Sequence, residues 1–355
     1  LDFCNKCKFI QSRVITNPHN RYIDIDYSYT SSNSNYSKNH WNEFAKQLNR
    51  KFKIEDKKIL EIGSNDGYLC SLLNKFGAKT LGVDASNFMV NLSRKIGVKS
   101  IHSIFSYKES LKIKKKYGNF DIIIANNVFN HSDFPNKFLK GVSNLLNPDG
   151  IYVFEQPDFT IGAASLKFDQ IYHEHVSYFT SLNIKTFLNK NKFRLIDINK
   201  NEYHGGSLRT YAIKNTSDFY KRKFTLDKFK KDKTVNTLSF FKKMNKDIQK
   251  KRLNLLKKIH LFLQNGYTIC GVGAGAKANT FLTYYSLDNK IITFLTDASK
   301  FKKNKFTPIT RIPIKDDNQI KKYKKIVCLI LSWNISSLII KKIKKLNKKA
   351  IILNT

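Results

Sequence analysis

Residues 58–70 read KILEIGSNDGYLC and decide the fold of the chain. The apolar run before Gly63 predicts a short buried strand, and the apolar residues after Gly67 predict a helix that begins at the glycine turn. The same alternation of strand and helix continues downstream. Further strands are expected at residues 78–84, 98–105, 121–127 and 150–156. This alternation predicts a doubly wound domain, in which helices cover both faces of a parallel sheet.

A second α/β domain is expected towards the C-terminus. Apolar residues recur at helical period over residues 217–266, which predicts one long helix before a second glycine turn and its strands. The predicted fold class is therefore α/β, with two doubly wound Rossmann-like domains and a small N-terminal Cys-containing module. We place these parts at residues 1–45, 46–215 (with an inserted active-site segment at 158–215) and 216–355.

The composition argues against a nucleic-acid-binding protein and against a membrane-spanning one. The formal net charge is +37, but only 9 of the 64 basic residues are Arg and no nucleic-acid module is visible, so we expect a solvated lysine surface without a specific nucleic-acid partner. No apolar run reaches the ~18 residues of a membrane span. Five Cys residues and no secretory signal favour reduced thiols in the cytoplasm. The sequence leaves a monomer and a homodimer equally open.

The glycine turn is the first candidate site. Glycines at a strand–helix junction let the backbone approach a ligand and expose the amides of the helix N-terminus. Asp84 ends the second expected strand, where a carboxylate can accept both hydroxyls of a ribose. The fourth strand ends in two amides that can meet the same ligand. The alternative is a turn that only packs helix on strand. The predicted cofactor-binding residues are Glu61, Gly63, Asp66, Gly67, Asp84, Asn126 and Asn127.

Two details favour S-adenosylmethionine over a dinucleotide at this turn. Glu61 lies two residues before the first glycine, where an acid suits a cationic, amino-acid-bearing ligand. Asn65 replaces the middle glycine of a G-x-G-x-G pattern, and a turn that binds pyrophosphate would tolerate that replacement poorly.

The segment Tyr172-His173-Glu174-His175 is the second candidate site. A neutral imidazole beside a carboxylate is suited to removing a proton near neutral pH. Hydrogen-bonded surface histidines are the structural alternative. A metal site is the third interpretation, but the spacing does not match the helical H-E-x-x-H pattern.

Together these motifs resemble the C-methyltransferases of deoxysugar biosynthesis, which methylate a carbon next to the keto group of a nucleotide-linked 4-keto sugar. The resemblance spans some 300 residues. It is carried, in order, by the Cys pair, the Tyr-Thr-Ser-Ser stretch at residue 29, LEIGSNDGYL, NNVFNHSDF, FDQIYHEHVSYF, HGGSLR and GVGAGAKANT. It implies a zinc-binding N-terminal module, a domain for the methyl donor S-adenosylmethionine, and a C-terminal Rossmann-like domain that helps to hold the nucleotide sugar.

The resemblance also implies roles for individual residues. His175 is the expected base, with Tyr172, Glu174, His131 and Tyr29 around the reacting ring. On the substrate side we expect His173, His204, Arg209, Gly273 and Lys277. The glycine turn at Gly273 and the Lys277 ammonium should meet the diphosphate, unless that turn is purely structural. Arg209 either clamps phosphate or pairs with a surface acid.

The expected zinc site is only half present. The family's module uses two Cys pairs, and only Cys4 and Cys7 occur here, so we expect either a truncated N-terminus or a module without metal. The rival functions are another small-molecule or RNA methyltransferase, a non-catalytic nucleotide-sugar-binding protein, and an NAD-dependent sugar oxidoreductase. The last lacks the Tyr-x-x-x-Lys arrangement of short-chain enzymes.

Overall fold

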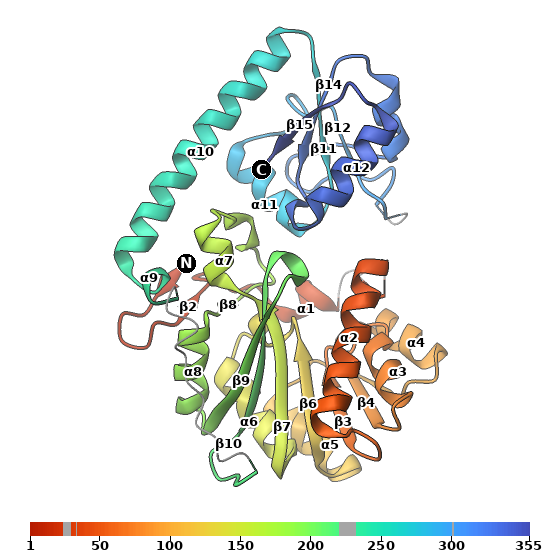
Figure 1. Ribbon diagram of the computed structural model, residues 1–355, viewed down its shortest axis with the longest axis vertical. Coiled ribbons are helices and arrows are strands. Elements are labelled where there is room, and N and C mark those ends of the chain that lie inside the picture. The colour runs from red at the N-terminus through yellow and green to blue at the C-terminus, as the bar shows by residue number, and fades with distance from the viewer. Residues whose placement is uncertain (24–29, 33, 220–231, 300–301) are drawn as a thin grey trace. The chain divides into compact units, whose positions relative to one another are not determined.

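A computed structural model describes residues 1–23, 30–32, 34–219, 232–299 and 302–355 (Figure 1). It divides into two compact units. Unit 1 holds residues 1–160 and 173–236, and unit 2 holds residues 161–172 and 237–355. Each unit contains a sheet flanked by helices, so the α/β fold expected from the sequence is confirmed. None of the described helices is both long enough and apolar enough to cross a membrane.

Unit 1 is built on a seven-stranded sheet in which β10 runs antiparallel to both of its neighbours and the other pairs are parallel. The strand order reverses between β3 and β6, and open sheets of this kind bind ligands beyond the carboxyl ends of the strands at such a point. The strands in spatial order are β5 (Ser100–His102), β4 (Lys79–Asp84), β3 (Lys58–Ile62), β6 (Phe120–Asn126), β7 (Leu146–Pro157), β10 (Ser207–Lys214) and β9 (Phe193–Asn201).

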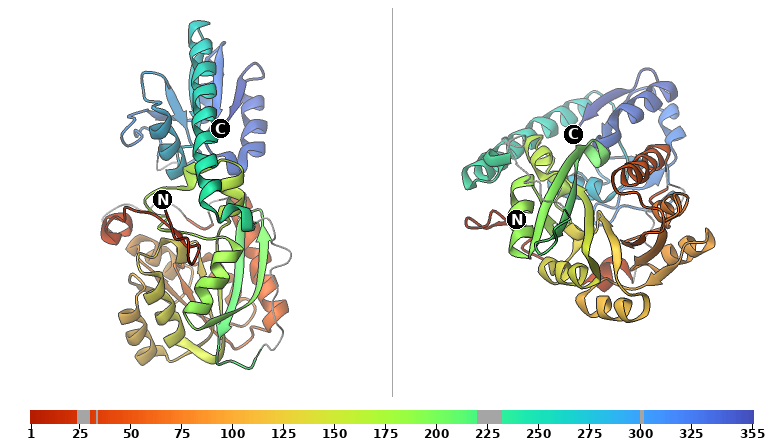
Figure 2. Two further views of the ribbon diagram at one scale, coloured as in Figure 1. Left: turned by 90° about the vertical axis from the view of Figure 1, so that its left-hand side faces the viewer. Right: turned by 60° about the horizontal axis from the view of Figure 1, so that its bottom comes forward.

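Helices cover both faces of this sheet (Figures 1 and 2). In β6, Ile122 and Ile124 pack against α2 and α3, while Ile123 and Ala125 pack in the cluster of α5, α6 and α8. Because both faces of β6 are buried, its sequence is a continuous apolar run and does not alternate. The helices of unit 1 are α1 (Pro18–Tyr22), α2 (Asn35–Phe52), α3 (Tyr68–Asn74), α4 (Asn87–Lys95), α5 (Tyr107–Tyr117), α6 (Pro135–Leu145), α8 (Ser181–Lys190) and α9 (Asp232–Val235).

The segment inserted after β7 contributes to two sheets. Its strands β9 and β10 extend the main sheet, and β8 (Ser177–Tyr178) pairs with β2 (Ile10–Gln11), which pairs with β1 (Asp2–Phe3). The N-terminal residues therefore form a three-stranded sheet with the chain directly after His175. The short helix α7 (Phe159–Ala164) spans the first boundary between the units.

Unit 2 has a five-stranded parallel sheet in the order β13 (Ile314–Lys315), β12 (Phe294–Thr296), β11 (Thr268–Val272), β14 (Ile326–Ile330) and β15 (Ile351–Asn354). Helices α10 (Leu238–Gln264) and α11 (Ala276–Tyr285) pack on one face. Helix α12 (Ser336–Leu346) and the 3-10 helix η5 (Asp317–Lys322) pack on the other.

The long helix expected over residues 217–266 is shorter in the structure. Residues 220–231 lie outside the described residues, and α10 begins only at Leu238. Thr237 caps it, since its hydroxyl oxygen accepts a hydrogen bond from the Phe240 amide at 3.2 Å. A threonine at this position satisfies one of the amide groups that the first helical turn leaves unpaired.

Candidate active site

The glycine turn of unit 1 has the backbone conformation that only glycine adopts easily. Gly63 lies at φ +72°, and a Cβ at this position would lie 2.1 Å from Cγ2 of Val128. Gly67 lies at φ +76° directly before α3, and a Cβ there would lie 2.3 Å from the Ser93 hydroxyl oxygen. Both glycines are therefore required by the local structure, and they leave the start of α3 open to a ligand.

Asp84 is anchored beside this turn. One carboxylate oxygen accepts a hydrogen bond from the Asn65 amide at 2.8 Å, and the other accepts one from the Ser86 amide at 2.9 Å. Burial raises the pKa of Asp84 above its usual value. Asn65 lies at φ +51°, a left-handed conformation that asparagine adopts more readily than most residues, so the turn keeps its shape without the middle glycine.

The carboxylate of Asp66, a predicted cofactor-binding residue, is hydrogen-bonded to the segment at Ser31 and Ser32. Its carboxylate accepts hydrogen bonds from the Ser32 amide at 3.1 Å, from the Ser32 hydroxyl at 2.6 Å and from the Ser31 hydroxyl. The Ser31 amide also donates to the Asn65 side chain at 2.8 Å. Asp66 and Asn65 thus hold residues 31 and 32 over the turn. The Tyr-Thr-Ser-Ser stretch stands out in the sequence, but its contact with Asp66 was not predicted.

Glu61 lies beneath the turn and is only 5% exposed. The Cys70 thiol donates to its carboxylate at 3.1 Å, and burial raises the pKa of Glu61 to about 8. Glu61 is the acid that we expected to suit a cationic ligand, and a bound cation would favour its ionised form.

The end of β6 supplies an amide that has no protein partner. Both the Nδ2 and Oδ1 atoms of Asn126 are buried and make no hydrogen bond within the described part of the chain. The next residue, Asn127, lies at φ +53°, and its amide donates to the Glu155 carbonyl at 2.6 Å. Buried polar atoms are normally satisfied, so an unpaired amide at the sheet's switch point fits a polar ligand. The turn, Asp84 and Asn126 together fit S-adenosylmethionine.

Two histidines meet in unit 1. His131 ends the 3-10 helix η1 (Phe129–His131), and its ring centroid lies 5.1 Å from that of His175, which is only 6% exposed. Backbone hydrogen bonds fix this arrangement. The Val176 amide donates to the Asn130 carbonyl at 3.0 Å, and the Ser12 amide donates to the Val176 carbonyl at 2.8 Å. The N-terminal sheet therefore braces the segment that carries His175.

The electrostatics of this cluster favour a neutral imidazole. Burial, assisted by Arg21 and His173, lowers the pKa of His131 to about 3, and its Nε2 is buried without a hydrogen-bond partner within the described residues. Burial raises the pKa of Glu174 to about 7, against the opposing effect of Arg21. A neutral His131 and a carboxyl poised near neutrality are suited to handling a proton.

Arg21 is a buried residue of this site that sequence reasoning missed. It is 2% exposed, forms an ion pair with Asp133, and donates to the His131 carbonyl at 3.5 Å. The Tyr22 ring lies parallel to that of His131, at 6.3 Å between centroids. Arg21 stands in a polar stretch without a motif, so no local signal pointed to it.

Three other residues were expected at this site: Tyr172 and Tyr29 around the reacting ring with His175, and His173 on the substrate side. His173 is 53% exposed, with its Nε2 atom 3.9 Å from the Glu174 carboxylate. Tyr172 is the last residue of the short segment that belongs to unit 2. Tyr29 lies outside the described residues.

Arg209 is not available to clamp phosphate. Its guanidinium donates to Glu155 at 2.7 Å and to the Gln47 side chain at 2.8 Å, and it is only 4% exposed. His40 also contacts Glu155, at 2.8 Å. The sequence left open a phosphate clamp or a pair with a surface acid, whereas the acid that Arg209 meets is fully buried. His204, at φ +56° in the turn before β10, has its ring 4.1 Å from that of Tyr203.

In unit 2 the second glycine turn lies at the carboxyl end of the central strand β11, followed by Lys277 on α11. Gly273 lies at φ +99°, where a Cβ would be 2.0 Å from the Ser332 hydroxyl oxygen, and the Ala274 amide donates to Asp297 at 2.8 Å. The ammonium of Lys277 lies 4.8 Å from the centre of the Trp333 ring, whose indole N–H donates to Asp169 at 2.6 Å.

Two protein families match successive parts of the chain. The methyltransferase domain family matches residues 36–198, and the C-methyltransferase C-terminal domain family matches residues 202–353. The C-methyltransferase NovU of Streptomyces niveus is 24% identical over 340 residues, which span 95% of this chain and 80% of that protein. The chain is an S-adenosylmethionine-dependent C-methyltransferase.

Other similar proteins match this methyltransferase over a smaller part. A ubiquinone biosynthesis O-methyltransferase of Coxiella burnetii is 23% identical over 170 residues, or 45% of this chain and 73% of that protein. A solved structure of magnesium protoporphyrin IX methyltransferase from Synechocystis PCC 6803, with bound SAH, has a TM-score of 0.40 and 16% identity over 50% of this chain and 83% of that chain.

The cysteine pair of the methyltransferase does not fit a zinc site. The Cys7 amide donates to the Cys4 sulfur at 3.5 Å, which makes a tight turn. However, no group of three or more His, Cys, Asp or Glu side chains that could hold a metal occurs among the residues the structure describes. Two thiols supply half of the four ligands that structural zinc takes, so we derive no role for zinc.

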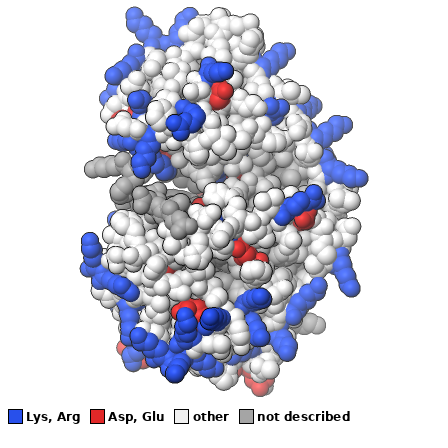
Figure 3. Space-filling view, turned by 180° about the vertical axis from the view of Figure 1, so that it is seen from behind, with Lys and Arg blue, Asp and Glu red and all other residues white. Residues whose placement is uncertain are grey.

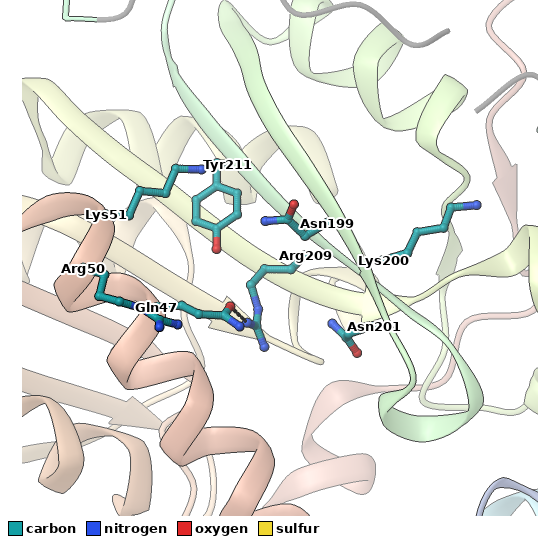
Figure 4. Close-up of a pocket in the computed structure, with 8 residues that line it drawn as sticks. All are labelled: Gln47, Arg50, Lys51, Asn199, Lys200, Asn201, Arg209 and Tyr211. Atoms are coloured by element: carbon teal, nitrogen blue, oxygen red, sulfur yellow. Dashed lines mark hydrogen bonds between the residues drawn. The ribbon is translucent and has the colours of Figure 1, made fainter. Parts of the chain in front are cut away.

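A polar hollow of about 460 Å³ lies between α2 and the strands β9 and β10 (Figure 4). Three of its cationic side chains already pair with or bond to other groups of the protein. Lys51 pairs with Asp197, Lys200 lies 3.2 Å from the buried Asp158, and Arg209 bonds to Gln47. The hollow includes none of the glycine-turn residues or the paired histidines, and we assign it no function.

Proposed function

We propose that this methyltransferase methylates the carbon next to the ketone of a nucleotide-linked 4-keto deoxysugar. The buried His131–His175 pair, with ring centroids 5.1 Å apart, is the observation that carries the proposal. Transfer to such a carbon needs a base that works near neutral pH, and a neutral imidazole can accept a proton there. The order of motifs along the chain supports the sugar substrate.

Several residues of unit 1 would hold the cofactor. The Gly63–Gly67 turn and the Asn126 amide would contact S-adenosylmethionine, with Asp84 receiving the ribose hydroxyls and Asn127 beside it. When bound, S-adenosylmethionine would supply an electrophilic methyl group to the deprotonated carbon, with the methyl's S–C bond broken and S-adenosylhomocysteine as the leaving group. Asp66 contributes indirectly, because it holds Ser31 and Ser32 over the turn.

The protein's own groups then handle the proton and the charge. His175 takes the proton from the carbon next to the ketone. Negative charge develops on the ketone oxygen, and an N–H of the neutral His131 donates a hydrogen bond to it. Glu174 and His173 would contact the sugar. For Tyr172 and Tyr29, the resemblance alone implies a role near the reacting ring.

In unit 2 we propose a diphosphate site at Lys277 and the Gly273 turn. Burial lowers the pKa values of Lys277 and Lys167 to about 8 and also lowers that of Lys251. The negative charge of Asp169 raises the pKa of each of the three lysines, so one carboxylate faces three ammonium groups. Burying ammonium groups without carboxylate partners is costly, and a bound polyanion would remove that cost. Nearby, Gly275 begins α11 without a side-chain cap, which leaves its amides free for phosphate oxygens.

Proton exchange tests the assigned base. A His175→Asn enzyme should bind S-adenosylmethionine as the parent does but exchange the proton next to the ketone with deuterated water about 10²–10⁴-fold more slowly. His260→Asn is the matched control, since His260 is an exposed histidine on α10 with no assigned role, and it should retain the parental exchange. Exchange at the parental rate by a His175→Asn enzyme that binds both ligands would remove His175 from this role.

The rival functions give different binding results. A non-catalytic sugar-binding protein would show no equilibrium affinity for S-adenosylmethionine. A methyltransferase with another small-molecule or RNA substrate would bind it but would leave every 4-keto sugar nucleotide unmethylated in a mass-spectrometric screen.

A further inference from the structure

Lysines are concentrated on one face of unit 2 far above their average in the chain. Ten of the 29 residues from 321 to 349 are Lys, and no Asp or Glu occurs from residue 318 to residue 355. All ten are exposed. We call this set the lysine surface: Lys321, Lys322, Lys324, Lys325, Lys341, Lys342, Lys344, Lys345, Lys348 and Lys349.

Two elements on the same face of the sheet carry the lysine surface. Helix α12 and the segment around η5 pack together over β14, where Ile320 and Ile343 are buried in one core cluster (Figure 1). The Asn347 side chain joins them, since it donates to the Ile320 carbonyl at 3.2 Å and to the Tyr323 carbonyl at 2.9 Å. The lysines therefore project from one continuous rigid surface.

Few acids neutralise this charge. Lys342 pairs with Asp317, at the start of η5, while Lys344 donates to the carbonyls of Lys348 and Ala350. Lys and Arg are also spread over the face of the molecule shown in Figure 3, with few Asp and Glu between them. The lysine surface differs in having no acid at all over the last 38 residues of the chain.

An exposed leucine lies among these lysines. Leu338 is 55% exposed, and Lys341, Lys342 and Lys345 follow it at spacings of three, four and seven, so the four share one side of α12. Ile343, on the opposite side, faces the core. Lysines around an exposed apolar side chain can combine attraction to anionic lipid with burial of that side chain in the membrane interface.

The same features disfavour nucleic acid as the partner. The lysine surface contains no Arg, which is the residue suited to bidentate contacts with guanine or phosphate. Its aromatic residue, Tyr323, is stacked on Phe294 at 5.4 Å and is not free to stack on a base. A lysine ammonium acts as a point charge, so it suits lipid phosphates, whose positions are not fixed relative to one another.

We propose that the lysine surface docks this methyltransferase on an anionic lipid bilayer, with Leu338 entering the interface. Binding would be peripheral and reversible, because it combines surface charge with a single apolar side chain. This inference is independent of the sugar substrate and of the base assigned above.

Sedimentation of the full-length protein with vesicles tests the proposal. It should bind vesicles of phosphatidylcholine and phosphatidylglycerol in equal parts, not phosphatidylcholine alone, and high salt should release it. Each lysine near an anionic surface contributes about fivefold to binding. Glutamine at Lys321, Lys341, Lys345 and Lys349 should therefore weaken binding by about a hundredfold or more. Leu338→Gln alone should weaken it several-fold.

A matched variant separates a local surface from net charge. Glutamine at four exposed lysines of unit 1 removes the same charge and should leave binding within a few-fold of the parent: Lys75, Lys95, Lys108 and Lys115. Both quadruple variants should keep the parental melting temperature and affinity for S-adenosylmethionine. The proposal is overturned by equal losses in the two variants, by no binding to anionic vesicles, or by tight binding to duplex DNA that replaces vesicle binding.

Discussion

Replacing Gly63 with alanine should damage the cofactor turn in two separable ways. The backbone lies at φ +72°, and holding a residue with a Cβ in that conformation costs about 1–2 kcal/mol. The new Cβ would lie 2.1 Å from Val128 Cγ2, and relieving such an overlap costs a further ~1–3 kcal/mol. Together these terms predict a loss of about 2–5 kcal/mol in the free energy of unfolding.

A second substitution tests whether the backbone cost and the overlap cost of Gly63→Ala are separate. Val128→Ala removes the colliding methyl groups, so the double variant should recover the overlap cost but not the backbone cost, with a coupling energy of about 1–3 kcal/mol. Urea unfolding measures the stability, and calorimetry measures affinity for S-adenosylmethionine, which should fall at least about tenfold in Gly63→Ala.

Gly97 provides the control for backbone strain alone. It lies at φ +82°, and a Cβ added there would meet no atom within 4 Å, so Gly97→Ala should lose only the backbone term and keep its affinity for the cofactor. A Gly63→Ala protein with parental stability and affinity would refute the reasoning. So would a double variant no better than Gly63→Ala alone.

Three further predictions concern buried charges. Arg21→Met should raise the pKa of Glu174 above about 7, because Arg21 opposes the effect of burial, and a pH–rate profile should show the acidic limb of kcat/KM at higher pH. Glu155→Gln should cost about 3–5 kcal/mol in urea unfolding at neutral pH, since it breaks a buried ion pair with Arg209. Burial alone would raise the pKa of Glu155, but Arg209 and His40 lower it to about 2. The ion pair therefore stabilises the fold fully above the unfolded-state pKa of ~4.3. The difference in unfolding free energy between the parent and Glu155→Gln should shrink as the pH falls towards about 2. Lys277→Met should weaken binding of a nucleoside diphosphate about tenfold in calorimetry while leaving affinity for S-adenosylmethionine unchanged.

Exposed residues of the same types serve as controls for these changes. Arg13→Met breaks an exposed pair with Asp2 and should leave the pH profile in place. Glu43→Gln removes an exposed carboxylate on α2 and should cost less than about 1 kcal/mol. Lys290→Met removes an exposed charge in unit 2. Effects of equal size in a control and its partner would contradict the assigned role of the buried group.

Local sequence was sufficient to predict the elements around the cofactor turn. The run before Gly63 is apolar because both faces of β3 are buried, and glycine at positions 63 and 67 follows from the left-handed backbone there. The fourth strand and its terminal Asn126 were predicted for the same reason. In each case the burial or backbone conformation of a few neighbouring residues explains both the residue pattern and the element it forms.

Contacts between distant segments were beyond such reasoning. Asp66 meets Ser31 and Ser32, more than thirty residues away, and nothing in the turn indicates that its carboxylate is already occupied. Arg209 is 54 residues from Glu155, so the sequence could not show which acid it would meet. Arg21 has no motif around it. Its importance arises only when the fold brings it to His131.

The hydrogen bonds from Ser12 to Val176 and from Val176 to Asn130 have a consequence for how the chain can be shortened. Removing the first twelve residues would leave the large sheet and its glycine turn whole. It would remove β2, the strand that pairs with β8 directly after His175. Such a shortened protein should still capture the methyl donor while turning over slowly, so donor capture and turnover would respond to different stretches of the same polypeptide.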